Sequence, residues 1–282
     1  MSTPTTPSVT ILGQGVRAAG LARILADHTL VTVWDENSDV RVQAAVTSAA
    51  VILLCTDDPE AAARILTHAD PHLASRDVVN LTSSTESQVR QLATQVTARG
   101  GRYLGGALMG HPEHVGRSET VLVYSGSPDL FQQHRQVLET LGSATFLGSD
   151  PATATLYETA MLNFAWATLV GYLHSAALLR TADIPAMTMT PLLTHWMSTT
   201  IAPVISDYAQ QIDGRRYPGA EEWLELDAPL MDHLIQTAEE RGVDPRLPQL
   251  VRSLTRAGIA AGFGAQSFAS LIEIVRTPTA ER

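Results

Sequence analysis

The stretch that decides the fold is Ser8-Val9-Thr10-Ile11-Leu12-Gly13-Gln14-Gly15-Val16-Arg17-Ala18-Ala19-Gly20. An apolar, β-branched run leads into a Gly-x-Gly-x-x-Ala turn, and an alanine-rich segment with helical periodicity follows to about Ala26. A second apolar run, Leu30–Trp34, ends on Asp35. Strand, glycine turn, helix, strand and acid in this order predict a dinucleotide-binding unit. The alternative is a structural glycine turn in another kind of α/β protein.

Each part of the turn has a physical role in such a unit. Gly13 permits the tight turn, Gly15 lets the backbone approach a pyrophosphate, and Ala18 keeps helix and strand close together. Unpaired N–H groups at the helix N-terminus attract the phosphates. We therefore predict that the turn and the polar residues at the following strand ends bind the cofactor. The predicted cofactor-binding residues are Gly13, Gln14, Gly15, Val16, Arg17, Asp35, Cys55, Thr56, Asn80, Thr82 and Ser83.

The composition is that of a globular chain, with 282 residues of which 45% are hydrophobic. The single cysteine, Cys55, excludes an internal disulfide and fits a reducing cytoplasm. A net charge of −10 argues against nucleic acid as a partner. We find no continuous apolar run long enough to span a membrane and no basic-then-apolar leader, so we expect neither a membrane span nor a signal peptide. Residues 1–7 are expected to form a short disordered tail.

All 19 basic residues are arginine, and the chain contains no lysine. This absence excludes a lysine general acid, a Schiff-base lysine and a P-loop lysine. The 9 histidines show no convincing metal-ligand spacing. His111, Glu113 and His114 cluster in one loop, but the sequence offers no further ligands near them, so we expect no metal site.

The first half of the chain alternates strands with helices. After Leu30–Trp34, strand-like runs cover residues 51–55, 77–81, 102–108, 120–126 and 144–148, with helix signals between several of them, as at 129–141. This pattern predicts an α/β N-terminal Rossmann domain over residues 8–151, built on a doubly wound parallel sheet. Its ligand is expected at the carboxyl ends of the strands.

The second half of the chain reads as helical. Residues 152–181 form a long run of mostly apolar and small residues, and helical segments punctuated by Pro and Gly continue to Arg276. We predict an all-α C-terminal domain over residues 152–282, joined to the first by the long interdomain helix 152–181. Because that helix is apolar on more than one face, it must be buried on more than one side. A homodimer in which each long helix packs into the partner satisfies this requirement.

Several runs, in order and nearly end to end, resemble a known family. They are Gly13-Gln14-Gly15, Val79-Asn80-Leu81-Thr82-Ser83, Gly106-Ala107-Leu108-Met109, Leu156-Tyr157, Gly171-Tyr172-Leu173-His174, Tyr208-Ala209-Gln210-Gln211-Ile212-Asp213 and Met231-Asp232-His233-Leu234. The chain resembles the imine reductases, a branch of the β-hydroxyacid dehydrogenase group within the 6-phosphogluconate dehydrogenase-like superfamily. The resemblance implies a Rossmann domain, an interdomain helix and an intertwined homodimer. It also implies an active site between one subunit's nucleotide domain and the other subunit's helices.

The resemblance also implies which residues act on the substrate. A typical β-hydroxyacid dehydrogenase relies on a lysine in the interdomain helix, which this chain lacks. Imine reductases carry an aspartate or tyrosine at their key position, and that position falls on Asn163. A second family tyrosine falls on Gly171, so Tyr172 beside it is the other catalytic candidate. The substrate pocket is expected to include Met109, Trp166, Met231 and Asp232. Asn163 could instead be a buried structural amide.

The resemblance implies an NAD(P)H-dependent reductase that transfers hydride to the C=N bond of a small, cyclic substrate. Because an amide is not an acid near neutral pH, we expect a preference for cationic or preformed iminium substrates. Asp35 suits ribose hydroxyls and repels a 2′-phosphate, and no adjacent arginine compensates, so NADH is favoured over NADPH. Two alternatives stay open: a catalytically impaired nucleotide-binding homologue, and a reductase of another polarised double bond.

Overall fold

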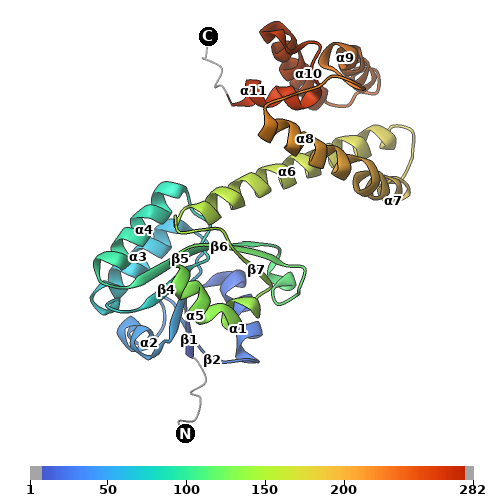
Figure 1. Cartoon of the computed structure of the whole chain (residues 1–282). Helices are drawn as coiled ribbons and strands as arrows, with labels where there is room; N and C mark the ends of the chain where they lie inside the picture. The colour runs from blue at the N-terminus through green and yellow to red at the C-terminus, as the bar shows by residue number, and fades with distance from the viewer. Residues whose placement is uncertain (1–7, 277–282) are drawn as a thin grey trace. The chain divides into compact units, whose positions relative to one another are not determined.

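The structure is a computed structural model that describes residues 8–276, so the predicted tail at residues 1–7 lies outside the described residues. The chain divides into two compact units between Phe164 and Ala165, within a long helix, α6 (Figure 1). The boundaries 8–151 and 152–282 stay a prediction. Each unit is described by itself.

The N-terminal unit is built on a seven-stranded sheet with the order β2-β1-β3-β4-β5-β6-β7. The first five strands in this order are parallel, β6 runs antiparallel to β5, and β7 is parallel to β6. The doubly wound, mostly parallel sheet is confirmed, with two reversed strands at one edge. Between β5 and β6 the chain forms only the short 3₁₀ turn η2, too short for a parallel crossover. The strands are β1 Ser8–Leu12, β2 Leu30–Trp34, β3 Val51–Leu54, β4 Asp77–Asn80, β5 Arg102–Met109, β6 Val121–Gly126 and β7 Ser143–Phe146.

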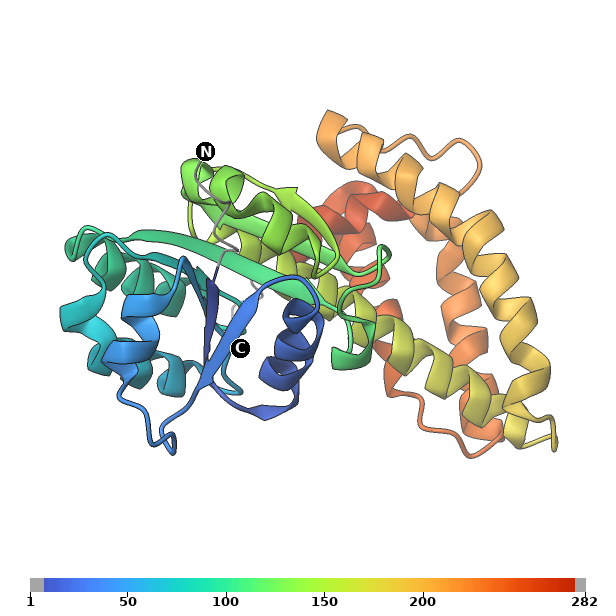
Figure 2. The ribbon, with the colours of Figure 1, turned by 90° about the horizontal axis from the view of Figure 1, so that it is seen from below.

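Helices cover both faces of this sheet (Figures 1 and 2). Alternate strand residues point to opposite faces, so Ile11 and Leu53 join the core under α1 and α5, while Leu12 and Leu54 join the core under α2, α3 and α4. Burial on both faces explains why the strands read as continuous apolar runs. The helices are α1 Gly15–Ala26, α2 Val42–Ser48, α3 Pro59–Ala69, α4 Glu86–Ala98 and α5 Pro128–Glu139.

Three of these helices begin with a side-chain cap. Asp58, Thr85 and Ser127 each accept a backbone N–H of the first helical turn. Asp58 and Thr85 also belong to the loops that follow β3 and β4. The caps therefore fix the two loops that lie at the carboxyl edge of the sheet.

The remaining helices confirm the predicted all-α region. Within it, the π-helical turn Met197–Ile201 joins α7 to α8 just before Pro203. Proline has no N–H to donate, so a locally wider turn keeps the helix continuous there. The helices are α6 Thr153–Arg180, α7 Ala186–Trp196, α8 Ala202–Gly214, α9 Leu224–Glu240, α10 Arg246–Gly258 and α11 Ile272–Val275.

The long helix α6 is anchored to the sheet only by its first turns. The N–H of Ala154 donates to Ser125 Oγ on β6 at 2.8 Å, and Ala154, Thr155 and Glu158 are buried. Residues 159–170 are all exposed in the isolated chain. By length and composition α6 could cross a membrane, contrary to our expectation that no such segment exists. The core helix of a water-soluble protein can have the same length and composition.

A buried charge cluster ties β4, β5 and α5 together at the amino edge of the sheet. Arg102 donates to both oxygens of Asp77, at 2.7 and 2.6 Å, and His134 Nε2 lies 2.7 Å from Asp77 Oδ2. Burial opposes ionisation of Asp77, but the hydrogen bonds from His134 and Arg102 outweigh it and hold the pKa of Asp77 below its ordinary value. The ionised carboxylate therefore stabilises the folded state.

Replacing Asp77 with Asn should lower the unfolding free energy at pH 7 by about 1–3 kcal/mol, the range for hydrogen bonds to a charged group. In the wild type, the stability due to Asp77 is present above the ordinary aspartate pKa and is lost as the pH falls through the lowered value. Asp77→Asn should therefore show a shallower loss of stability on acidification. Urea unfolding between pH 7 and pH 3 measures both effects, with the exposed Asp27→Asn as control. Equal pH dependence in wild type and Asp77→Asn would contradict this role.

Candidate functional site

The carboxyl edge of the sheet is organised by a backbone contact at Gly13. A Cβ on Gly13 would lie only 1.8 Å from the carbonyl oxygen of Cys55, and Gly13 has a φ of 144°. The N–H of Gly13 donates to the carbonyl of Trp34 at 2.9 Å. Gly13 therefore allows the ends of β1, β2 and β3 to meet, and no other residue fits there.

Gly15 begins α1 and faces the crevice. Its φ is 93°, and a Cβ there would come within 2.5 Å of a carboxylate oxygen of Asp57. Gln14 and Val16 on either side are exposed, as an open phosphate cradle requires. Our sequence reasoning missed Asp57, because Thr56-Asp57-Asp58 reads as a helix start. Since like charges repel, a pyrophosphate bound at Gly15 would displace this exposed carboxylate.

The acids after β2 are held in place. Asp35 Oδ1 accepts the N–H of Asn37 at 2.9 Å and the hydroxyl of Ser38 at 3.1 Å. Among residues 8–276, the hydrogen bonds to this carboxylate are accepted by Oδ1. Oδ2 is therefore available to accept a hydrogen bond from a ribose hydroxyl. Glu36 Oε1 lies 3.4 Å from Arg64 Nε on α3, an exposed ion pair that the sequence did not reveal.

Three predicted cofactor residues hold the loops after β3 and β4 against each other. The N–H of Thr56 donates to Thr82 Oγ1 at 3.0 Å, and the N–H of Thr82 donates to Asn80 Oδ1 at 3.0 Å. Asn80 Nδ2 in turn donates to the Tyr103 hydroxyl at 3.0 Å. All of these side chains are buried. These buried hydrogen bonds hold the two loops at the base of the crevice in one arrangement.

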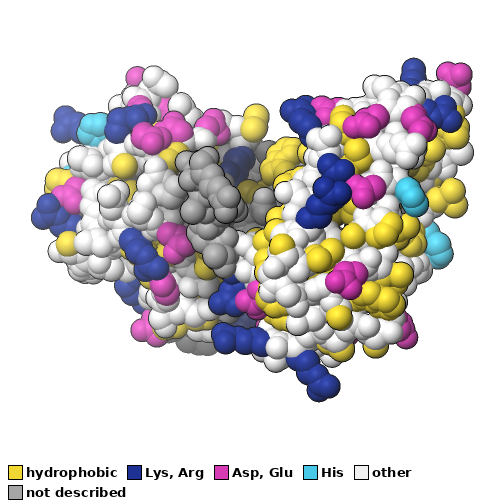
Figure 3. Space-filling view, turned by 90° about the horizontal axis from the view of Figure 1, so that it is seen from above, with side chains coloured by type: hydrophobic (Ala, Val, Ile, Leu, Met, Phe, Trp, Pro, Cys, Tyr) yellow, Lys and Arg dark blue, Asp and Glu magenta, His cyan; other side chains and the backbone are white. Residues whose placement is uncertain are grey.

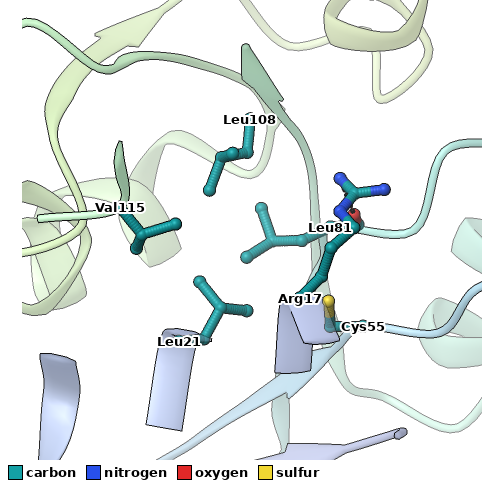
Figure 4. A pocket seen from close by; sticks show the side chains of 6 residues that line it. All are labelled: Arg17, Leu21, Cys55, Leu81, Leu108 and Val115. Carbon is teal, nitrogen blue, oxygen red and sulfur yellow. Dashed lines mark hydrogen bonds between the residues drawn. The ribbon is translucent and has the colours of Figure 1, made fainter. Parts of the chain in front are cut away.

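Cys55 lines a small apolar pocket beneath the first turn of α1 (Figure 4). Burial raises the pKa of the Cys55 thiol to about 11, although the charge of Arg17 acts in the opposite direction. The group stays a neutral thiol at physiological pH and is a poor nucleophile. The pocket is lined by Arg17, Leu21, Cys55, Leu81, Leu108 and Val115.

Ser83 links the turn helix to α6. Its hydroxyl donates to Glu158 Oε1 at 2.6 Å and accepts from Arg17 Nη1 at 3.2 Å. Arg17 Nη2 also donates to the carbonyl of Leu81 at 3.3 Å. Glu158 is only 6% exposed. Glu158 was not among the predicted site residues, because the sequence shows only a single acidic residue within a helix.

The two catalytic candidates lie on α6. Asn163 is exposed, so its own chain does not bury it as a structural amide. The Tyr172 hydroxyl lies 3.1 Å from Thr190 Oγ1 on α7. Nine positions along a regular helix amount to about 900° of rotation, so Asn163 and Tyr172 lie on opposite faces of α6. A joint role for the two residues stays a prediction, and the helix geometry gives it no support.

The predicted substrate-pocket residues fall in different units. Met109 ends β5 in the N-terminal unit, where it lines a surface pocket with His114 and Thr120. Trp166, Met231 and Asp232 belong to the helical unit. Trp166 is exposed, and Arg252 donates to Asp232 at 2.9 Å. That hydrogen bond holds the pKa of Asp232 below its ordinary value.

Comparison with known proteins identifies the family. Residues 11–149 match the NAD binding domain of 6-phosphogluconate dehydrogenase, and residues 150–277 match the C-terminal domain of NADPH-dependent reductive aminase-like proteins. The NADPH-dependent reductive aminase of Aspergillus oryzae is 30% identical over 281 residues, covering 93% of this chain and 95% of that protein. The chain belongs to the imine reductase and reductive aminase family.

Solved structures agree with this assignment. An imine reductase from Bacillus cereus BAG3X2 is 29% identical with a TM-score of 0.88, covering 96% of this chain and 99% of that chain. A reductive aminase from Aspergillus terreus, in complex with NADPH4, cyclohexanone and allyl amine, is 28% identical with a TM-score of 0.89. That match covers 96% of this chain and 100% of that one. The predicted resemblance is confirmed.

Replacing Gly15 with Ala should weaken NADH binding by at least tenfold, because a methyl group would occupy the backbone approach that a pyrophosphate needs. Gly100→Ala is the matched control: Gly100 also has a positive φ, 75°, but its Cβ would meet nothing within 4 Å. Both variants carry the same kind of backbone strain, so fluorescence titration with NADH separates strain from lost contact. Unchanged affinity in Gly15→Ala would refute this placement of the phosphates.

Proposed function

We propose that this chain reduces small cyclic imines, bound as iminium or protonated imine ions, with NADH as hydride donor. Family membership makes it an NAD(P)H-dependent oxidoreductase acting on C=N bonds. The observation that carries the finer proposal is an intact coenzyme crevice combined with an α6 that offers the amide of Asn163 and no lysine. The open backbone at Gly15 fits the bound pyrophosphate of a dinucleotide.

The proposed reaction requires little acid catalysis from the protein. When bound, the nicotinamide supplies the hydride. An iminium ion already carries positive charge on nitrogen, so no proton has to be delivered during its reduction. A neutral imine does need a proton, and an amide cannot supply one near neutral pH. In this proposal Asn163 orients the nitrogen, or a water beside it, by hydrogen bonding.

The preference for NADH rests on the acids after β2. Asp35 presents Oδ2 where a ribose hydroxyl can donate to it, and its charge repels a 2′-phosphate. Arg64 is a cation near this edge, but Glu36 pairs with it. The reductive aminase of Aspergillus oryzae is NADPH-dependent, so the proposal separates this chain from that relative.

Exchanging Asp35 for Asn together with Glu36 for Arg should shift coenzyme preference towards NADPH. The exchange removes repulsion, frees Arg64 and adds a bidentate phosphate partner. We expect about 1–3 kcal/mol in relative binding free energy. Glu36→Gln alone should shift the preference in the same direction by less, whereas Glu60→Gln, another exposed acid, should not. Dissociation constants for both coenzymes measure the effect, and a wild type that already prefers NADPH would refute the argument from Asp35.

We propose a homodimer that covers α6. Apolar side chains lie over one face of the helical unit (Figure 3), and α6 carries many of the exposed ones. Contiguous exposed apolar area on this scale marks an association surface. A solution mass of twice 30.3 kDa tests this proposal. The exposed apolar residues on α6 are Leu156, Tyr157, Met161, Leu162, Phe164, Trp166, Leu169, Val170 and Leu173.

No nucleic acid or membrane partner is proposed, and a cytoplasmic location fits the single, unpaired Cys55.

One observation favours a second candidate, a homologue that binds the nucleotide without turnover. The chain carries Asn163 and Gly171 where the family resemblance implies acid or tyrosine side chains. Such a protein would bind NADH but oxidise none of it on addition of a cyclic imine. A screen of small cyclic imines with NADH and with NADPH, following coenzyme oxidation, separates the two candidates.

The Asn163 side chain gives the sharpest test of the mechanism. Asn163→Ala should leave NADH binding intact and slow turnover roughly tenfold to several hundredfold, by analogy with the loss of one oxyanion donor. Where the proposed partner subunit covers α6 and excludes water, Asn163→Asp adds a carboxyl whose pKa desolvation raises, so neutral imines should gain relative to N-alkylated iminium ions. The measurement is the ratio of the two rates between pH 5 and pH 9, with Thr181→Ala, just beyond the C-terminal end of α6, as control. If both Asn163 variants behave like wild type, the amide has no role in turnover.

A further inference from the structure

The Ser83 hydroxyl lies between a guanidinium and a carboxylate that reach it from two different helices. Arg17 is on the first turn of α1, and Glu158 is on the second turn of α6. The two hydrogen bonds join residues 66 and 75 positions apart in the chain. Both partners lie in the N-terminal unit, so their geometry belongs to one compact body.

The chemistry of these groups fixes the direction of both hydrogen bonds. A guanidinium has only N–H donors, so Arg17 donates to Ser83 Oγ. A hydroxyl has one proton and two lone pairs, and the proton of Ser83 goes to Glu158. One lone pair of Ser83 therefore remains. Ser83 is exposed, so a ligand in the crevice can reach it.

The position of Ser83 says which half of the coenzyme it meets. β2 and β4 lie on opposite sides of the β1–β3 pair, where the strand order reverses. A dinucleotide lies across such a switch point. Asp35 after β2 takes the adenosine ribose, so the loop after β4 lies towards the nicotinamide and the reacting carbon.

We propose that Glu158 and Arg17 hold the Ser83 hydroxyl as a hydrogen-bond acceptor for an N–H donor at the nicotinamide end of the crevice. The donor is either the carboxamide of the nicotinamide or the N–H of a protonated imine. Glu158 and Arg17 are positioning residues, because they act through Ser83. Their role is to keep the serine proton away from the ligand.

This inference rests on the proposed function and makes it more specific. If the imine supplies the N–H, the site favours substrates whose nitrogen carries a hydrogen over N,N-disubstituted iminium ions, since both are cations and only the first can donate. If the carboxamide supplies it, Ser83 sets the orientation of the nicotinamide ring. Loss of one such hydrogen bond corresponds to roughly tenfold in binding or rate.

The first arm of the experiment measures binding alone. Calorimetry gives dissociation constants for NADH and for the analogue with an acetyl group in place of the carboxamide, which has no N–H. If the carboxamide is the donor, Ser83→Ala weakens NADH roughly tenfold and leaves the acetyl analogue unchanged. Ser84→Ala is the matched control, because Ser84 is the next residue of the loop and donates instead to the carbonyl of Thr82.

The second arm measures kcat/KM for a cyclic imine and for its N-methyl iminium counterpart. If the substrate is the donor, Ser83→Ala lowers kcat/KM for the N–H substrate roughly tenfold and spares the N-methyl compound. Glu158→Gln keeps the shape but can donate to Ser83 and turn its proton towards the ligand. It should reproduce the loss, and in a Ser83→Ala background it should add nothing, because coupled residues are not additive.

Two results overturn the inference: Ser83→Ala indistinguishable from Ser84→Ala in both arms, or losses from Ser83→Ala and Glu158→Gln that add in the double variant. A wild type that binds NADH but reduces no imine contradicts the proposed function instead. In that case the binding measurements alone test the inference. If Ser83→Ala weakens NADH and the acetyl analogue equally, the inference is refuted. Ser83 is exposed, so Ser83→Ala is expected to fold normally.

Discussion

The carboxyl edge of the sheet depends on the backbone contact between Gly13 and the carbonyl of Cys55. No Cβ fits in this contact, and any side chain there would push the ends of β1 and β3 apart. In the same turn, the N–H of Gly13 donates a hydrogen bond to the carbonyl of Trp34 at the end of β2. Because the three strand ends meet there, the loops that carry Asp35, Thr56 and Ser83 open onto one crevice. The proposed coenzyme site thus depends on how closely the strands pack.

The crevice has an unusual charge distribution. Acids lie along it at Asp35, Glu36 and Asp57, while the positive contribution comes from the N-terminus of α1 and from Arg17. In the proposed binding mode, a pyrophosphate meets the helix N-terminus and a ribose meets the acids. An additional phosphate on that ribose would meet carboxylates and an arginine already paired with Glu36. We therefore attribute the proposed preference for NADH to electrostatics rather than to the shape of the turn.

The sequence predicted the features that depend on local patterns. β-branched apolar runs located the strands of the sheet to within one residue at most ends, and α6 was expected at 152–181 and observed at Thr153–Arg180. The reversal of β6 was not foreseen, because strand direction depends on the length of the preceding connection. The contacts of Ser83 with Glu158 and of Glu36 with Arg64 were also missed, as was the position of the Asp57 carboxylate beside Gly15. Each joins segments far apart in the chain, and neither periodicity nor spacing encodes such pairs.

We propose that this chain delivers hydride to the carbon of a C=N bond with no lysine on the interdomain helix and with an amide, Asn163, where the family resemblance implies an acid or a tyrosine. The most direct measurement uses NADH deuterated at C4, in separate 4R and 4S forms, with a small cyclic imine. With one of the two forms, we expect one deuterium on the carbon adjacent to nitrogen in the product amine for each NAD⁺ formed. Coenzyme oxidation that leaves this carbon unlabelled with both forms would show that hydride is not delivered to the C=N carbon.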